Sequence, residues 1–300
     1  TPKIKTMPPK EASLIFAGAG EYYLERDNLN QAIDFFSESV TLDSTNRFGR
    51  QGLSDSYVRK GNEHLEKDET DKAKFFFEEA IKYDDRNATA YAGLGDVYDT
   101  LGQENESLKN YEKALEIDGS LTELYAPVGI LYYQQGEIAN AEKYLTKALE
   151  TAPNDAQTQY FLGLIRYKQN RLDDALTAFR RSLQTDANNA EAHYFIGEVY
   201  GKQGKENEAI AEYQKATQIN PKYIEAWFDL GVAQYNNENY TAAVAAYEKV
   251  IQLKNDYWEA YANLGDTHRL MNEPGKAEGA YRIAVSRIKD DAELHSKFGY

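Results

Sequence analysis

The chain contains no cysteine, and it has only seven prolines and two tryptophans in 300 residues. Without cysteine it can form no disulfide, no thiolate metal site and no thiolate nucleophile. It also lacks any run of about 18 apolar residues, so the sequence predicts no membrane-spanning helix. Absence of cysteine suits the cytoplasm and the periplasm equally, and the compartment therefore stays open between these two.

Basic charge is scarce as well, because 34 lysines and arginines face 49 aspartates and glutamates, a formal net charge of -15. A nucleic-acid-binding protein needs a basic face that displaces counterions, so we expect no nucleic-acid partner. The four histidines lie 27 or more residues apart, and no phosphate loop or nucleophile elbow occurs. We therefore expect no metal, no cofactor and no enzyme activity.

What the sequence does contain is a strict repeat of 34 residues. Glycine recurs with this period at Gly61, Gly95, Gly129, Gly163, Gly197, Gly231, Gly265 and Gly299. A second series of small residues follows in step, at Ala73, Ser107, Ala141, Ala175, Ala209, Ala243 and Ala277. Small residues at a fixed period indicate places where two helices approach closely. The period predicts an array of one supersecondary unit rather than a globular core.

Each repeat predicts two helices joined by a turn. With repeats starting at Ser54, Ala88 and every 34 residues after, positions 4, 7, 8 and 11 are mostly apolar, aromatic or glycine, which gives one face of a first helix, helix A. The second series begins a similar face on a second helix, helix B. Residues that tolerate the left-handed conformation end helix A, at Gly102, Gly136, Asn170, Gly204 and Asn272.

This pattern resembles the tetratricopeptide repeat (TPR) family. The clearest copies read AYAGLGDVYDTLGQENESLKNYEKALEID at 90–118 and AWFDLGVAQYNNENYTAAVAAYEKVIQL at 226–253. The resemblance covers about residues 13–300. It implies an all-α fold, a right-handed superhelical solenoid of antiparallel helix pairs that forms a TPR array. It says little about function, since architecture defines the family.

The boundaries follow from the repeat. We expect a linker at 1–12 and a TPR domain at 13–300, with repeats at 13–46, 47–87, 88–121, 122–155, 156–189, 190–223, 224–257 and 258–291, and a partial unit or capping helix at 292–300. The second repeat carries seven extra residues, roughly 47–53. Because seven residues make about two helical turns, we favour a long helix from about Arg47 to Glu66, and the alternative is a loop.

The resemblance places helix A on the concave side, where positions 2, 5, 9, 12 and 13 are not needed for packing. In the central repeats these positions give candidate peptide-binding residues Tyr133, Gln134, Tyr160, Leu164, Tyr167, Lys168, Tyr194, Glu198, Phe228, Val232 and Tyr235. An aromatic and aliphatic strip with scattered polar groups suits an extended or helical peptide. The alternative is that these rings pack against neighbouring repeats and leave no open surface.

We expect a non-catalytic protein–protein interaction scaffold that binds a peptide or protein segment in the concave groove. One alternative is a regulatory or targeting portion of a larger enzyme or secretion machine. The other is a self-assembling array, a homo-oligomer joined through the unfinished repeat at 292–300.

Overall fold

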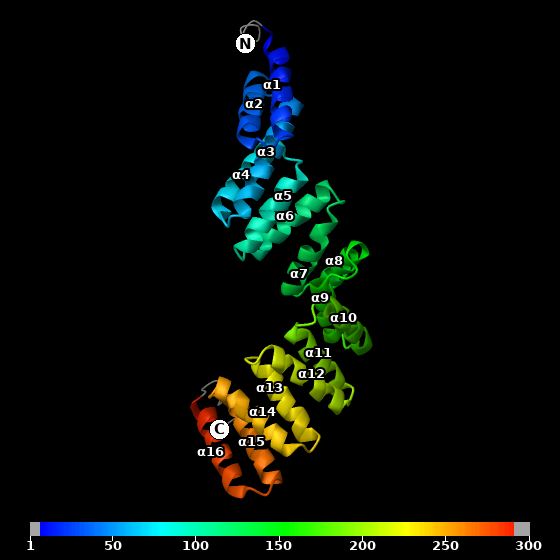
Figure 1. Ribbon diagram of the computed structural model, residues 1–300, viewed down its shortest axis with the longest axis vertical. Helices are drawn as coiled ribbons and strands as arrows, with labels where there is room; N and C mark the ends of the chain where they lie inside the picture. Colours follow the sequence, from blue (N-terminus) through cyan, green and yellow to red (C-terminus); the bar gives the residue numbers. More distant parts are fainter. Residues whose placement is uncertain (1–6, 291–300) are drawn as a thin grey trace. The chain divides into compact units, whose positions relative to one another are not determined.

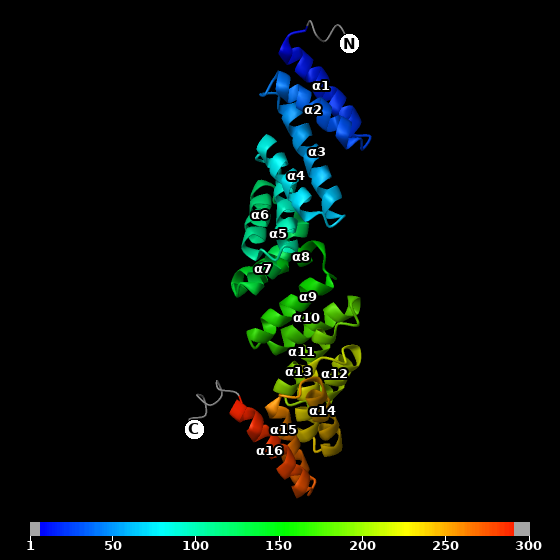
Figure 2. The ribbon, with the colours of Figure 1, turned by 90° about the vertical axis from the view of Figure 1, so that its left-hand side faces the viewer.

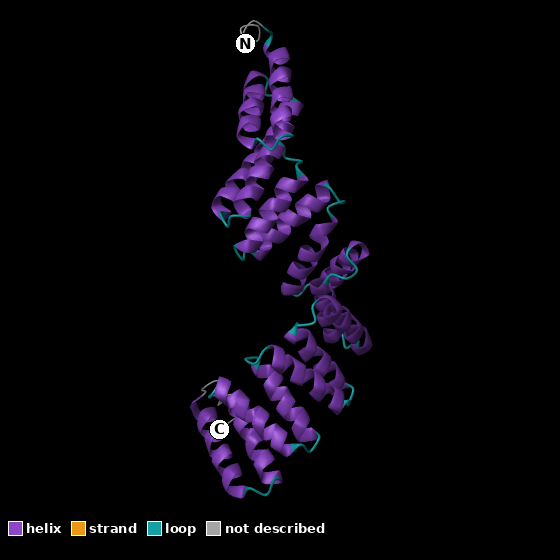
Figure 3. Ribbon diagram, in the orientation of Figure 1, coloured by secondary structure: helices purple, strands orange, loops and turns teal. Residues whose placement is uncertain are grey.

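The computed structural model describes residues 7–290, and the side chains of residues 7–287. In this part of the chain every regular element is a helix (Figure 3). None of these helices is long and apolar enough to cross a membrane. The chain divides into two compact units, Thr1–Thr151 and Ala152–Tyr300. The expected solenoid of helix pairs is confirmed, and the expected repeat at 292–300 lies outside the described residues.

The first unit is built from four helix pairs, which run from blue to green in Figure 1. Its helices are α1 (Pro9–Leu24), α2 (Leu29–Leu42), α3 (Arg47–Leu65), α4 (Thr70–Tyr83), α5 (Ala88–Thr100), α6 (Glu104–Ile117), the short 3₁₀ helix η2 (Thr122–Leu124), α7 (Tyr125–Gln134) and α8 (Ile138–Thr151). Loops of three to four residues join most neighbours, and such short loops turn the chain back on itself.

The second unit repeats the same arrangement. Its helices are α9 (Ala156–Lys168), α10 (Leu172–Thr185), α11 (Ala190–Lys202), α12 (Glu206–Ile219), α13 (Ile224–Asn236), α14 (Tyr240–Leu253), α15 (Trp258–Leu270) and α16 (Pro274–Asp290). In both units each helix packs mainly on its neighbours in the sequence. Odd-numbered helices correspond to helix A of the repeat, and even-numbered helices to helix B.

The periodic small residues mark the closest approach of the two helices in a pair. Phe179 of α10 lies over Gly163 of α9, and a Cβ placed on Gly163 would come within 2.5 Å of the phenylalanine ring. Ala175, from the second series, is fully buried. An aromatic ring or a leucine of helix B occupies the equivalent place in every other described repeat. The spacing of glycine therefore records where helix B rests on helix A.

The turns from helix A to helix B use the left-handed conformation that the sequence predicted. Gly102, Gly136, Asn170, Gly204 and Asn272 have positive φ, as expected. Three residues that the sequence did not indicate, Asp27, Asp68 and Glu238, adopt the same conformation. Aspartate is enriched in the left-handed conformation because its short side chain can form a hydrogen bond with the nearby backbone. The longer side chain of Glu238 is not favoured in this way. The repeat geometry therefore overrides residue preference at Glu238.

The linker prediction for residues 1–12 is wrong in its last four residues. Helix α1 begins at Pro9, with Pro8 as its N-cap. Proline is favoured in the first helical turn because its missing N–H would have no intrahelical partner there. The Pro- and Lys-rich composition thus concealed a helix start. Residues 1–6 lie outside the described part of the chain.

Helix α3 contains the seven additional residues of the second repeat. It runs from Arg47 to Leu65, and Asn46 caps it by accepting hydrogen bonds from the backbone N–H groups of Phe48 and Gly49. The amide of Asn46 also donates to the Ser13 hydroxyl at 2.7 Å, which ties the start of α3 to α1. The two extra turns lie beside α1 and α2 (Figure 2).

Helix α7 is the exception among the A helices, because it has only ten residues. Pro127 lies in its first turn. Had the α-helix continued back through Thr122–Leu124, the proline ring would clash with the carbonyl of Glu123, and no N–H would bond to it. These three residues form the 3₁₀ helix η2 instead.

Candidate interaction surface

Nine of the eleven candidate residues lie on three A helices of the second unit, and eight of these nine form one surface. We call this set the tyrosine face: Tyr160, Leu164 and Tyr167 of α9, Tyr194 and Glu198 of α11, and Phe228, Val232 and Tyr235 of α13. The 34-residue period brings them to equivalent positions on successive helices. Leu164 is only 7% exposed and offers almost no surface. The other seven are half-buried.

Carboxylates hold the tyrosine hydroxyls of this face in place. Glu198 accepts hydrogen bonds on its two oxygens, one from the hydroxyl of Tyr167 at 2.8 Å and one from that of Tyr213 at 2.6 Å. The hydroxyl of Tyr194 donates to Asp229 at 2.8 Å. Two fixed carboxylates therefore orient three phenol rings from α9, α11 and α12.

Burial sets the charge state of this network. It raises the pKa of the Asp229 carboxyl to about 6, and the nearby carboxylates of Glu198 and Glu225 act in the same direction. Burial also raises the pKa of Tyr194, and the negative charge of Asp229 adds to this effect. The Tyr167 pKa is raised for the same reasons, with Glu198 as the neighbour. The phenols consequently remain neutral hydrogen-bond donors.

The rings of the tyrosine face also contact neighbouring repeats. Phe195 of α11 lies among three rings, with centroids 6.4 Å from Tyr160, 5.6 Å from Tyr167 and 5.8 Å from Phe179. Phe228 lies 5.2 Å from Tyr257. These contacts cover one side of each ring. Because the tyrosines and Phe228 stay half-buried, each ring still presents part of its surface to solvent.

Sequence reasoning missed four contributors to this surface. Phe195 and Asp229 occupy position 6 of their repeats, and Tyr223 and Tyr257 occupy the last position. Tyr194 lies 5.0 Å from Tyr223, centroid to centroid. Both positions were left out because most other repeats have unrelated residues at them. These residues could have been found from the sequence, because aromatic or acidic residues occur at these two positions only in the second unit.

The remaining candidates belong to the first unit or to the end of α9. Tyr133 and Gln134 belong to α7 of the first unit, where Tyr133 is half-buried and Gln134 is exposed. Lys168 is the exposed last residue of α9. A lysine of α11 covers one of the rings, since the Lys202 ammonium lies 3.9 Å from the centroid of Tyr167. A cation is thus already bound on the phenol face of Tyr167.

The three histidines in the described residues make structural contacts with glutamates. The distances from Nδ1 to the carboxylate are 2.5 Å for His64 and Glu69, 2.6 Å for His193 and Glu212, and 2.7 Å for His268 and Glu273. Lys72, Lys215 and Lys276 contact the same three glutamates. Across residues 7–290 no group of three or more metal-binding side chains comes together.

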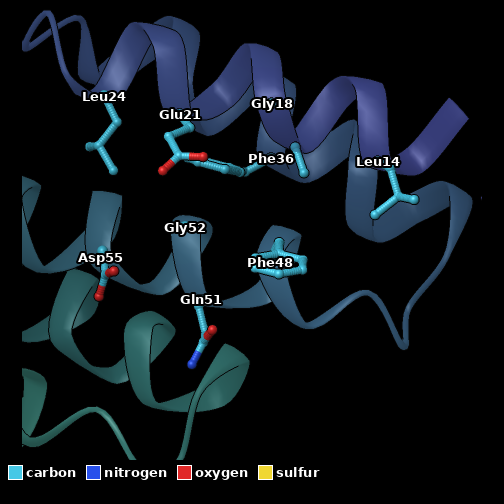
Figure 4. Close-up of a pocket in the computed structure, with 10 residues that line it drawn as sticks. Leu14, Gly18, Glu21, Leu24, Phe36, Phe48, Gln51, Gly52 and Asp55 are labelled. Carbon is cyan, nitrogen blue, oxygen red and sulfur yellow. The ribbon is translucent and has the colours of Figure 1, made fainter. Parts of the chain in front are cut away.

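The first unit has a separate cleft between α1 and α3, which we call the α1–α3 slot. It has a volume of about 350 Å³. Figure 4 shows Leu14, Glu21 and Leu24 reaching from α1, and Phe48 reaching from the extra turns of α3. Gly18 and Gly52 both line it. A Cβ on Gly18 would enter open space, whereas a Cβ on Gly52 would come within 2.2 Å of the Phe36 ring. No sequence signal predicted this cleft, because it depends on the two extra turns of α3.

Family models match most of the array. Models described as "Tetratricopeptide repeat" match residues 54–87, 88–120, 129–190 and 224–257, and one described as "TPR repeat" matches residues 202–238. Together these segments cover more than half of the chain. Among curated proteins, none matches the sequence.

Solved structures share the fold. One described as "YrrB: a TPR protein with an unusual peptide-binding site" is 25% identical, with a TM-score of 0.54, and the match covers 64% of this chain and 95% of that one. MamA is 24% identical over 55% of this chain and 97% of its own, with a TM-score of 0.53. The APC/C Cut9–Hcn1 structure is 15% identical over 89% of this chain and 51% of its own, with a TM-score of 0.55.

Proposed function

The chain belongs to the tetratricopeptide repeat family, and we propose that it is a non-catalytic scaffold that binds a peptide or protein segment on the tyrosine face. The similarity to YrrB, a protein described as having a peptide-binding site, supports this kind of ligand. The fold itself is shared by proteins with different partners, so the choice of surface depends on the side chains of this chain.

One observation carries the proposal: the tyrosines of α9 and α11 are half-buried yet fixed. Hydrogen bonds to Glu198 and Asp229 hold the rings of Tyr167 and Tyr194 before any ligand arrives. A ring that is already ordered loses little conformational entropy on binding. Tyrosine also offers a large apolar area, and such residues are enriched among those that contribute most to binding.

The same surface offers little for catalysis. The carboxylates of Glu198 and Asp229 already accept hydrogen bonds from tyrosines. The three described histidines are each engaged with a glutamate outside this face. No nucleophile and base lie within reach of each other on the tyrosine face in a triad-like arrangement. These features favour a binding surface over an active site.

The test is a double substitution, Tyr167→Ala with Phe228→Ala. Both proteins would be used for affinity capture from an extract of the host, and the captured proteins compared by mass spectrometry. We expect a partner that the wild type captures and the double variant loses. Because both rings are half-buried, the helix content of the variant should remain that of the wild type by circular dichroism.

The control removes two exposed apolar side chains from B helices, Phe75→Ala in α4 with Ile283→Ala in α16. This variant loses similar apolar area away from the tyrosine face and should still capture the partner. Equal capture by the wild type and the Tyr167/Phe228 variant would rule out the tyrosine face. Capture of nothing by any of the proteins would speak against the scaffold itself.

A further inference from the structure

The α1–α3 slot exposes apolar side chains that remain uncovered by the described residues of the first unit. Phe48 is 70% exposed and Leu14 is 57% exposed, and both line the slot. Phe48 belongs to the two extra turns of α3, which the regular 34-residue repeat lacks. Exposed apolar side chains that line one cleft together are typical of an interaction site.

Glycine keeps the slot open. A Cβ on Gly18 would meet no atom within 4 Å outside its own helix, so packing does not require glycine there. Its φ is also an ordinary helical one, and glycine in a helix interior lowers stability relative to alanine. Gly18 therefore has neither a packing nor a conformational reason to be glycine. What its missing side chain provides is space inside the slot.

The charges that line the slot have one sign. Among the described residues that line it, only Glu21 and Asp55 carry charge, and none is a lysine or an arginine. Glu21 points from α1 into the space between the two helices, whereas the carboxylate of Asp55 turns away from α1 (Figure 4). Asp55 accepts a hydrogen bond from Asn87 at 2.9 Å. Among the described side chains, residues 7–287, neither carboxylate has a salt bridge within 4.0 Å, although the charge of Arg59 acts on Asp55 and lowers its pKa against the larger effect of burial.

We propose that the α1–α3 slot is a second binding site, which takes a peptide segment with an apolar side chain and a nearby lysine or arginine. The apolar side chain lies over Gly18 between Leu14 and Phe48, and the cation lies beside Glu21. Charge complementarity selects this occupant over an acidic one. The slot belongs to the first unit and the tyrosine face to the second, so this proposal does not depend on the proposed function above.

The experiment uses a phage-displayed library of random twelve-residue peptides, selected on the full chain. Peptides that are enriched would be synthesised and their affinities measured by titration calorimetry. We expect sequences that combine a large apolar residue with lysine or arginine. Gly18→Leu should fill the slot and lower their affinity at least tenfold. Phe48→Ala should weaken binding about fivefold or more, since a central aromatic anchor is lost.

The charge is tested separately with Glu21→Gln. Exposed ion pairs are weak, so we expect the affinity to fall about two- to fivefold, and the difference from the wild type to shrink at high salt. Gly18→Leu is expected to fold at least as well as the wild type, because leucine favours helix and meets no obstacle at this position. Loss of binding in this variant can thus be separated from loss of structure.

Two matched controls accompany these variants. Gly279 of α16 is also an exposed helical glycine with nothing within 4 Å of its Cβ position, and Gly279→Leu should leave peptide affinity unchanged. The Tyr167→Ala, Phe228→Ala protein should bind the selected peptides as the wild type does. These controls separate failure of the slot from failure of the tyrosine face.

Several outcomes would overturn the proposal. One is enrichment of peptides without basic residues, and another is equal binding by wild type and Gly18→Leu. A third is enrichment of no peptide at all. If a concentration-dependent dimer of the chain also disappeared in Gly18→Leu, the slot would belong to a second copy of the chain instead.

Discussion

One carboxylate of the tyrosine network, Asp229, makes the stability of the fold depend on pH. Its pKa is raised from 3.8 to about 6, chiefly by burial. In the unfolded chain the carboxyl releases its proton near pH 4, while the folded chain keeps it up to about pH 6. The folded state therefore binds more protons between these values, and stability falls as pH rises through this window.

We predict that Asp229→Asn reduces the loss of stability between pH 4 and pH 7. Asparagine cannot ionise, but its side-chain oxygen still accepts a hydrogen bond from the hydroxyl of Tyr194. The free energy of unfolding of the wild type should drop by about 1–3 kcal/mol more than that of the variant between pH 4 and pH 7. Urea unfolding followed by circular dichroism at both pH values measures this difference. An identical drop in both proteins would contradict the charge state assigned to Asp229.

The sequence predicted part of this residue-scale picture. Tyr167, Tyr194 and Phe228 were selected as candidates because their positions on helix A are not needed for packing in an ideal repeat. Asp229 and Phe195 were missed because an ideal repeat assigns nothing to position 6. The side chains of Asp229 and Phe195 contact residues of the preceding repeat, and this contact depends on how successive helix pairs stack. That stacking is a property of three-dimensional packing, which periodicity in one sequence does not encode.

Among the elements, α7 shows how one residue changes a whole helix. The A helices α9, α11 and α13 each have 13 residues, whereas α7 has ten and is preceded by η2. At position 6, where α7 has Pro127, those helices have Phe161, Phe195 and Asp229. Each of these residues supplies the N–H that proline lacks. The repeat pattern predicted the boundaries of this pair but not its irregular start.

We predict that Pro127→Ala extends α7 back through Thr122. The alanine N–H could bond to the carbonyl of Glu123, and the clash with the proline ring would be gone. Helix content by far-UV circular dichroism should rise by about one turn, and stability by about 1 kcal/mol. Pro221→Ala is the matched control, because Pro221 lies in a turn outside any helix. A Pro127→Ala protein without added helix would show that packing, not proline, sets the start of α7.

The two extra turns of α3 were predicted from the sequence, but the cleft beside them was not. Seven residues equal about two helical turns, so the insertion preserves the faces of the helix, and the sequence favoured a helix on that ground. The structure has this helix from Arg47 to Leu65. The count of helical turns predicts the helix, but it does not predict the α1–α3 slot that the longer helix forms with α1. A cleft depends on which side chains are absent, and Gly18 looks ordinary in the sequence.

Across the whole molecule, stability is divided among local contacts. Helices pack mainly on neighbours in the sequence, and each unit has its own buried clusters. Val58, Phe77 and Leu94 belong to one cluster of the first unit, and Tyr213 and Leu230 belong to one of the second. Contacts of this kind make the stability of an array close to a sum of repeat and neighbour terms.

We therefore predict that residues 1–151 and residues 152–300 fold as separate fragments. Each should give a helical far-UV circular dichroism spectrum and its own urea transition. A fragment of residues 1–137 is the control, because it removes α8 and uncovers the buried side chains Val128 and Leu131 of α7. It should be less stable than residues 1–151. An unstructured 152–300 fragment would contradict the division of the core between two units.

One side-chain contact that occurs in two repeats bears on how the number of repeats in the gene can change. The bond between His64 and Glu69, with Lys72 beside it, reappears between His268 and Glu273, with Lys276 beside it. The two copies are in the same register. Recombination between two such copies would therefore remove or add whole repeats while keeping both the reading frame and the helix contacts at the junction. The α1–α3 slot lies outside the stretch between these copies, so length could vary while that cleft was inherited intact.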